Sequence, residues 1–150
     1  MEIFKSLIEG ERCTIVLTVD ALLDKIPELS YIKSKILPLK EGDILDVDEF
    51  KSRLVELGYE KTETVEGVGE FAIRGGIIDI FPLTEETPYR IDMWDDEIDT
   101  IRSFDVESQR SIERVESVNI YPATEMVLSK TRINKGIKAI EAELKPYEEK

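Results

Sequence analysis

The chain has 150 residues, of which 41% are hydrophobic and 35% are charged, a balance typical of one globular domain with a core. Its 20 basic and 33 acidic side chains give a net charge of −13, which repels phosphate and argues against a nucleic-acid-binding surface. One cysteine and no histidine exclude an internal disulfide and every catalytic or metal site that needs histidine.

Residues 1–30 carry the pattern of part of an α/β unit. Apolar side chains recur at helical spacing in residues 1–9, and residues 21–26 predict a short helical turn. Between them, the apolar run 14–19 predicts a fully buried strand, and Cys13 beside it is expected to be a buried hydrophobe. Since this strand has no sheet to join, we interpret residues 1–30 as the remnant of a preceding α/β domain of a longer protein.

Residues 31–122 are predicted to be the main domain, a small and mainly antiparallel α+β domain. It begins with a strand at residues 35–39 and a helix that either Asp46 or Asp48 caps. Gly58 is the expected residue just beyond the end of this helix. The apolar face of the helix comprises Phe50, Leu54, Val55 and Leu57.

The rest of this domain is predicted to be rich in strands. They are expected at residues 59–66, 70–81, 89–94, 97–104 and 114–120. The pair Gly75-Gly76 interrupts the second of these strands and predicts a bulge or a tight bend. The pair Asp95-Asp96 predicts a hairpin turn between the third and the fourth.

Residues 123–150 are predicted to lead to the next part of the longer protein through a long helix, with Ser129 as its N-cap. The apolar stripe of this helix comprises Ile133, Ile137, Ile140 and Leu144. An uncovered stripe of this kind is unfavourable in water, and we expect residues 1–26 to pack on it. We find no signal peptide and no apolar run near ~18 residues, and therefore expect no membrane association and a cytoplasmic location.

Several stretches of the central sequence have a characteristic order and spacing. They are Leu57-Gly58-Tyr59, Gly69 to Pro82, Pro88 to Asp92, Asp95 to Asp99, and Phe104 to Ser111. Together they resemble the N-terminal UvrB-homology module of the bacterial transcription-repair coupling factor family. The excision-repair protein UvrB shares this module, but Ala72 stands where UvrB carries a second arginine, and UvrB lacks the Ser-Gln-Arg-Ser run at 108–111. Both departures favour the coupling factor.

The resemblance implies a protein-docking module without catalysis of its own. Members of the family bind UvrA through this module and so recruit nucleotide excision repair to a stalled RNA polymerase. RNA polymerase, DNA and ATP would be bound only by other parts of the longer protein, and the sequence contains no Walker A loop. We therefore expect UvrA as the partner and no cofactor in this chain.

The resemblance also assigns the partner-binding residues. The family's UvrA contacts match Arg74, Arg90 and Trp94, and Trp94 replaces the phenylalanine that the family usually has. Lys61 stands where UvrB has an arginine contact, and it keeps the charge without the planar guanidinium. Asp92, which lies between Arg90 and Trp94 in the sequence, is included in the predicted partner-binding set.

Strand alternation places the same residues on one face of the sheet without reference to the family. The predicted core face comprises Phe71, Ile73, Ile91 and Met93. The opposite face then carries Arg74, Arg90 and Trp94, and arginine and tryptophan are enriched among binding hot spots.

Three alternatives stay open from the sequence. The arginines could pair with Asp92, Asp95 or Glu70 and leave Trp94 as a half-buried rim residue. The chain could instead be a DNA-contacting part of a DNA-repair helicase or translocase. It could also carry an autoinhibitory surface that another domain of the longer protein covers.

Overall fold

The structure of the protein, a computed structural model, describes residues 1–23, 26–124 and 130–148. The helices are α1 (Glu2–Glu9), α2 (Val19–Leu23), α3 (Leu29–Lys33), α4 (Val47–Glu56) and α5 (Lys130–Glu148). The strands are β1 (Leu37–Lys40), β2 (Glu60–Lys61), β3 (Glu70–Arg74), β4 (Ile77–Ile80), β5 (Tyr89–Trp94), β6 (Glu97–Phe104), β7 (Ser111–Val115) and β8 (Ser117–Ile120).

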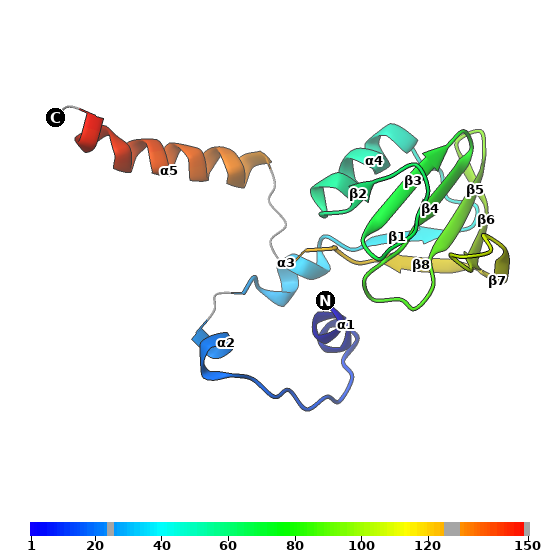
Figure 1. Cartoon of the computed structure of the whole chain (residues 1–150), viewed down its shortest axis with the longest axis horizontal. Coiled ribbons are helices and arrows are strands. Elements are labelled where there is room, and N and C mark those ends of the chain that lie inside the picture. Colours follow the sequence, from blue (N-terminus) through cyan, green and yellow to red (C-terminus); the bar gives the residue numbers. More distant parts are fainter. Residues whose placement is uncertain (24–25, 125–129, 149–150) are drawn as a thin grey trace.

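The main body of the molecule contains two sheets (Figure 1). One has six strands in the order β2-β3-β4-β5-β6-β7, and the other pairs β1 with β8. Neighbouring strands are antiparallel apart from β2 and β3, which are parallel. The predicted α+β class with a mainly antiparallel sheet is therefore confirmed.

Helix α4 shows how local sequence signals determine an element. The Asp46 carboxylate accepts a hydrogen bond from the Glu49 N–H at 2.9 Å, so Asp46 is the N-cap. At the other end, Gly58 has a left-handed backbone with φ of 90°, as predicted for the residue after the helix. Leu54 is fully buried, whereas Val55 is 56% exposed, because the next position lies about 100° further around a helix. Val55 is therefore not part of the apolar face, contrary to the prediction.

The core lies between α4, the β1–β8 pair and one face of the six-stranded sheet. The four residues predicted to face it do so: Phe71 and Ile91 are fully buried, and Ile73 and Met93 pack against the cluster. In β6, Ile98 and Ile101 both face the core although they are an odd number of residues apart. A register shift between β5 and β6 explains this, because an extra residue changes which face the following side chains reach.

Both predicted turns are confirmed. Gly75-Gly76 is a tight bend between β3 and β4, and Asp95-Asp96 joins β5 to β6. The strand expected at 59–66 is wrong beyond Lys61, since only β2 is extended and paired. Val65 in that segment is instead fully buried in a small second cluster with Phe104.

The strand expected at 114–120 is two strands that belong to different sheets. The chain bends at Glu116, so that β7 pairs with β6 while β8 pairs with β1. The Glu116 carbonyl accepts a hydrogen bond from the Glu41 N–H at 3.0 Å, which holds the bend beside the β1–β8 ladder. Both halves are extended, and residue periodicity therefore could not reveal the change of sheet.

The segment before α2 differs from the prediction. Residues 11–18 form neither helix nor strand, so the buried strand expected at 14–19 is wrong. Val16 is 91% exposed, and Cys13 is exposed rather than buried. A buried strand needs neighbours on both sides to bond its backbone groups, and no strand of the described ranges pairs with this segment.

Helix α1, in contrast, has one buried side chain and contacts the sheet domain through polar side chains. Phe4 is buried, and the Lys5 ammonium lies 2.7 Å from a carboxylate oxygen of Glu85. The Tyr121 hydroxyl donates a hydrogen bond to Glu9 at 3.0 Å. These contacts join the first residues of the chain to the loop before β5 and to the residue after β8.

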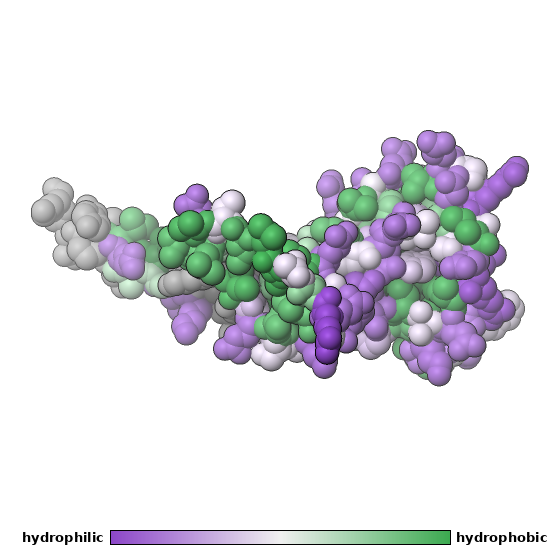
Figure 2. Space-filling model, turned by 90° about the horizontal axis from the view of Figure 1, so that it is seen from below, coloured by the Kyte–Doolittle hydropathy of each residue, from purple (hydrophilic) through white to green (hydrophobic). Residues whose placement is uncertain are grey.

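Helix α5 extends away from the sheets (Figure 1). Its apolar stripe is exposed, by 42% at Ile133 and 60% at Ile140, so the expectation that residues 1–26 cover it is wrong. Ser129, the predicted N-cap, lies outside the described residues. Figure 2 shows hydrophobic residues gathered over the part of the molecule between the six-stranded sheet and the end that is drawn in grey. None of the helices in the described ranges combines the length and apolar character that crossing a membrane requires.

Candidate functional site

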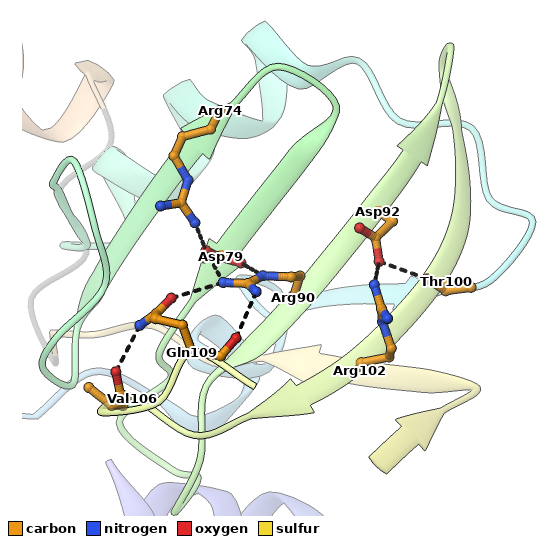
Figure 3. A network of polar contacts seen from close by, with 8 residues as sticks. All are labelled: Arg74, Asp79, Arg90, Asp92, Thr100, Arg102, Val106 and Gln109. Atoms are coloured by element: carbon orange, nitrogen blue, oxygen red, sulfur yellow. Dashed lines mark hydrogen bonds and ion pairs between the residues drawn. The ribbon is translucent and has the colours of Figure 1, made fainter. Parts of the chain in front are cut away.

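The face of the six-stranded sheet that points away from α4 carries a network of charged side chains (Figure 3). At its centre is Asp79 on β4, whose side chain is almost completely buried. Arg90 on β5 donates to both carboxylate oxygens of Asp79, at 2.7 and 2.9 Å, and Arg74 on β3 donates to one of them. Two of the predicted residues therefore meet at a carboxylate that the prediction did not include.

Sheet register explains why these three side chains meet. Asp79 lies directly opposite Arg90 in the β4–β5 ladder and opposite Ala72 in the β3–β4 ladder. Arg74 follows Ala72 by two positions, so it reaches Asp79 along the diagonal of the same face. An arginine side chain is long enough to reach both a directly opposite and a diagonal neighbour. The guanidinium groups of Arg74 and Arg90 therefore both contact the buried Asp79 carboxylate.

Arg90 is enclosed by its surroundings. Its guanidinium also donates to the Gln109 backbone carbonyl at 3.2 Å and to the Gln109 side-chain oxygen at 3.0 Å, and it lies 4.4 Å from the centre of the Phe104 ring. The side chain is only 15% exposed. The hydrogen bonds to Asp79 raise the pKa of Arg90 above its usual value.

The loop between β6 and β7 holds Gln109 in place. Asp105 accepts hydrogen bonds from the Ser108 N–H at 2.9 Å and from the Ser108 hydroxyl at 2.6 Å. Gln109 has a left-handed backbone with φ of 57°, and its amide donates to the Val106 carbonyl at 2.8 Å. The hydrogen bonds from Ser108 lower the pKa of the Asp105 carboxyl. Residues 105–110 thus form a compact turn against Arg90, and the Ser-Gln-Arg-Ser run ends at the first residue of β7.

Asp92 belongs to a second pair on the same face. It forms an ion pair with Arg102 on β6 and accepts a hydrogen bond from the Thr100 hydroxyl at 2.8 Å. The arginines at 74 and 90 therefore do not pair with Asp92, as the sequence had left open, and no ion pair of the described residues joins them to Asp95 or Glu70 either.

Trp94 and Lys61 stand apart from this network. Trp94 ends β5 next to the Asp95-Asp96 turn and is 80% exposed, so it is not a half-buried rim residue. Lys61 is exposed on the short strand β2, at one edge of the sheet. No ion pair of Lys61 is seen within the part of the chain that the structure describes.

Sequence reasoning missed Asp79, Gln109 and Arg102. One signal could have found the first: Asp79 is the only polar residue of the strand Ile77–Ile80. A carboxylate within an apolar strand is costly unless it is paired, and its presence predicts a cationic partner on the neighbouring strand. For Gln109, no pattern in the sequence indicated that the loop turns back onto Arg90.

The chain is an α+β domain whose six-stranded sheet has one packed and one charged face, and comparison with known proteins identifies its family. Residues 37–126 match the family described as the UvrB interaction domain, to which the chain belongs. The chain is 44% identical to the transcription-repair-coupling factor of Bacillus subtilis over 85% of its length, and 38% identical to that of Escherichia coli over 82%. It spans about 11% of each of these relatives.

Proposed function

We propose that this chain is a protein-docking module of a bacterial transcription-repair-coupling factor and that it binds UvrA through the open face of its six-stranded sheet. Docking of this kind would bring nucleotide excision repair to a stalled RNA polymerase in the cytoplasm. Contacts with RNA polymerase, DNA and ATP would belong to other parts of such a protein. The observation that carries the proposal is the Arg74–Asp79–Arg90 cluster, which lies within the residues that match the UvrB interaction domain.

Arg74 is the member of this cluster that can reach a partner. Its side chain is 44% exposed, and only one of its nitrogens, Nη2, has a hydrogen-bond partner among the described residues. The two arginines and Asp79 together carry a net charge of +1, in a chain whose overall charge is −13. An acidic or carbonyl-rich surface on UvrA would complement this local positive charge.

Trp94 supplies an aromatic anchor. Its side chain is 80% exposed at the end of the β5–β6 hairpin, and an exposed tryptophan gains much contact area when a partner covers it. The β3–β4 turn lies next to this hairpin end, because the Met93 N–H donates to the Gly76 carbonyl at 2.7 Å. Arg74, which precedes that turn, and Trp94 therefore border the same end of the sheet.

Calorimetric titration of the chain with purified UvrA tests the proposal. Arg74→Ala should weaken binding by about tenfold or more, since a hot-spot side chain contributes more than about 1.4 kcal/mol. Arg53→Ala is the matched control, because Arg53 is exposed on α4, which covers the opposite face. Equal affinities of a folded Arg74→Ala, Arg90→Ala double variant and the parent chain would show that the site is wrong.

Further variants compare how much each residue of the proposed surface contributes to UvrA binding. Trp94→Phe restores the family's usual residue and should bind, whereas Trp94→Ala should not. Arg90→Lys should bind more weakly than the parent, because lysine cannot donate to both Asp79 oxygens in the fork geometry of arginine. Lys61→Ala should have the smallest effect. Asp92→Asn tests the last predicted contact, which the structure shows paired with Arg102.

A duplex-DNA titration separates docking from the nucleic-acid alternative. With a net charge of −13, the chain should not retard duplex DNA at physiological salt. A clear shift with a steep salt dependence would support the alternative that this chain contacts DNA itself.

A further inference from the structure

We propose that Asp79 is a positioning residue for UvrA binding: it fixes the guanidinium groups of Arg74 and Arg90 in the orientation that the partner reads. This inference rests on the proposed function. Its role is indirect, since the Asp79 side chain is only 1% exposed and cannot itself contact a protein partner.

The first argument is geometric. Without an acid between them, two guanidinium groups on one sheet face repel each other and sample many rotamers, which costs entropy when a partner binds. Asp79 uses both of its oxygens for Arg90 and shares one of them with Arg74. A single buried carboxylate therefore sets the relative position of both cations before any partner arrives.

The second argument concerns the side of the network away from Arg74. Gln109 accepts two hydrogen bonds from Arg90, at 3.0 and 3.2 Å, and the Phe104 ring lies against the same guanidinium. Arg90 is therefore held from several directions, while Arg74 is held by Asp79 alone among the described residues. This asymmetry suggests that Gln109 holds Arg90, that Arg90 in turn holds Asp79, and that Arg74 makes the exposed contact.

For Asp79→Asn, the change in charge and the loss of positioning predict opposite changes in the affinity for UvrA. The variant raises the net charge of the cluster from +1 to +2, and attraction to an acidic partner alone would then strengthen binding. If Asp79 acts by positioning the arginines, binding should instead weaken, by about tenfold. Calorimetric titration of the variant with purified UvrA therefore decides between the two by the direction of the change.

A double-mutant cycle tests whether Asp79 acts through Arg74. In the Arg74→Ala background, Asp79→Asn should change the UvrA affinity by much less than it does in the parent chain, because the side chain that it positions is gone. Additive losses would show that Asp79 acts independently of Arg74 and would overturn the proposal.

A spectroscopic measurement tests the positioning without any partner. In the ¹⁵N-labelled chain, the guanidinium protons of Arg90 should exchange with water more slowly than those of the exposed Arg53. Asp79→Asn should make this difference smaller but not remove it, because Gln109 and Phe104 still contact the Arg90 guanidinium. If the wild-type chain fails to bind UvrA, the proposed function is wrong, yet this measurement still decides whether Asp79 holds the arginines. Exchange of Arg90 as fast as that of Arg53 in the wild type would overturn the proposal.

Gln109→Ala is the second variant, in case Asp79→Asn does not fold. It removes the side-chain acceptor for Arg90 but keeps Asp79 and the backbone acceptor. It should weaken UvrA binding by roughly threefold and accelerate guanidinium exchange, in keeping with the loss of one hydrogen bond to a charged group. No change in either measurement would count against the proposal.

Discussion

The two faces of the six-stranded sheet are built from alternate residues of the same strands, yet they carry different kinds of side chain. One face is apolar and packs against α4 and the β1–β8 pair, where Phe71 and Ile91 are fully buried. The other carries the ion pairs centred on Asp79 and Asp92. The comparison teaches that the packed face and the charged face can be changed separately, because neighbouring residues on one strand reach opposite faces.

The largest expected effect belongs to the packed face. Phe71→Ala should lower the free energy of unfolding by about 3–5 kcal/mol, because it leaves a cavity in the core. Arg74→Ala on the same strand should cost about 1 kcal/mol or less, since Asp79 keeps its contacts with Arg90. Urea denaturation measures both. Similar losses of unfolding free energy in Phe71→Ala and Arg74→Ala would contradict the conclusion that the packed face supplies most of the stability.

The next prediction concerns the link between α4 and the sheet. Gly58 has φ of 90°, and a Cβ there would lie 2.7 Å from a methyl group of Thr124. Gly58→Ala should therefore lower the free energy of unfolding by about 2 kcal/mol or more, through backbone strain and the clash together. Gly75→Ala is the matched control, because its φ is also positive but no atom lies within 4 Å. Thermal unfolding measures the stability of both variants. Equal losses of stability in Gly58→Ala and Gly75→Ala would show that the structure relieves the clash with Thr124 at no cost.

A smaller effect is expected at the start of α4, which supports the packed face. Asp46→Ala should lower the free energy of unfolding by about 1 kcal/mol, because the Glu49 N–H loses its capping acceptor. Asp48→Ala, one of the two caps that the sequence left open, should change it by less than about 0.5 kcal/mol. The two variants are compared by chemical denaturation, and a larger loss at Asp48 would contradict the observed cap.

The smallest expected effect lies in the loop that braces the charged face. The pKa of Asp105 is lowered by hydrogen bonds from Ser108, so the folded state gains stability from this group above the ordinary aspartate pKa of about 3.9 and loses it as pH falls through the lowered value. A ¹³C NMR titration should show the lowered midpoint. Ser108→Ala should raise it, whereas Ser111→Ala should not. An unchanged midpoint in Ser108→Ala would assign the shift to another cause.

Much of the fold could be predicted from the sequence because local rules governed it. Asp46 before an apolar helix, the Gly75-Gly76 bend and the Asp95-Asp96 turn each depend on short-range chemistry. The alternation of Phe71, Ile73, Ile91 and Met93 gave the correct face to the core. The division of the chain at residues 30 and 122 stays a prediction.

The features that failed depend on which elements meet in three dimensions. An apolar run at 14–19 resembles a buried strand, but only neighbouring strands could make it one. The break at Glu116 reflects a change of sheet, which alternation cannot reveal. In the candidate site, alternation placed the arginines on one face but could not show that Asp79 joins them, or that Gln109 covers Arg90.

The pairing of β1 with β8 has a consequence for how the chain folds. Leu37 and Ile120 are partners in this ladder although they are roughly 80 residues apart, whereas the ladders from β3 to β7 join strands that follow one another in the chain. Closing so long a loop costs more entropy than forming a hairpin, so β1 should join the structure last. During synthesis, β1 would leave the ribosome early and wait without a partner until almost the entire domain had followed it.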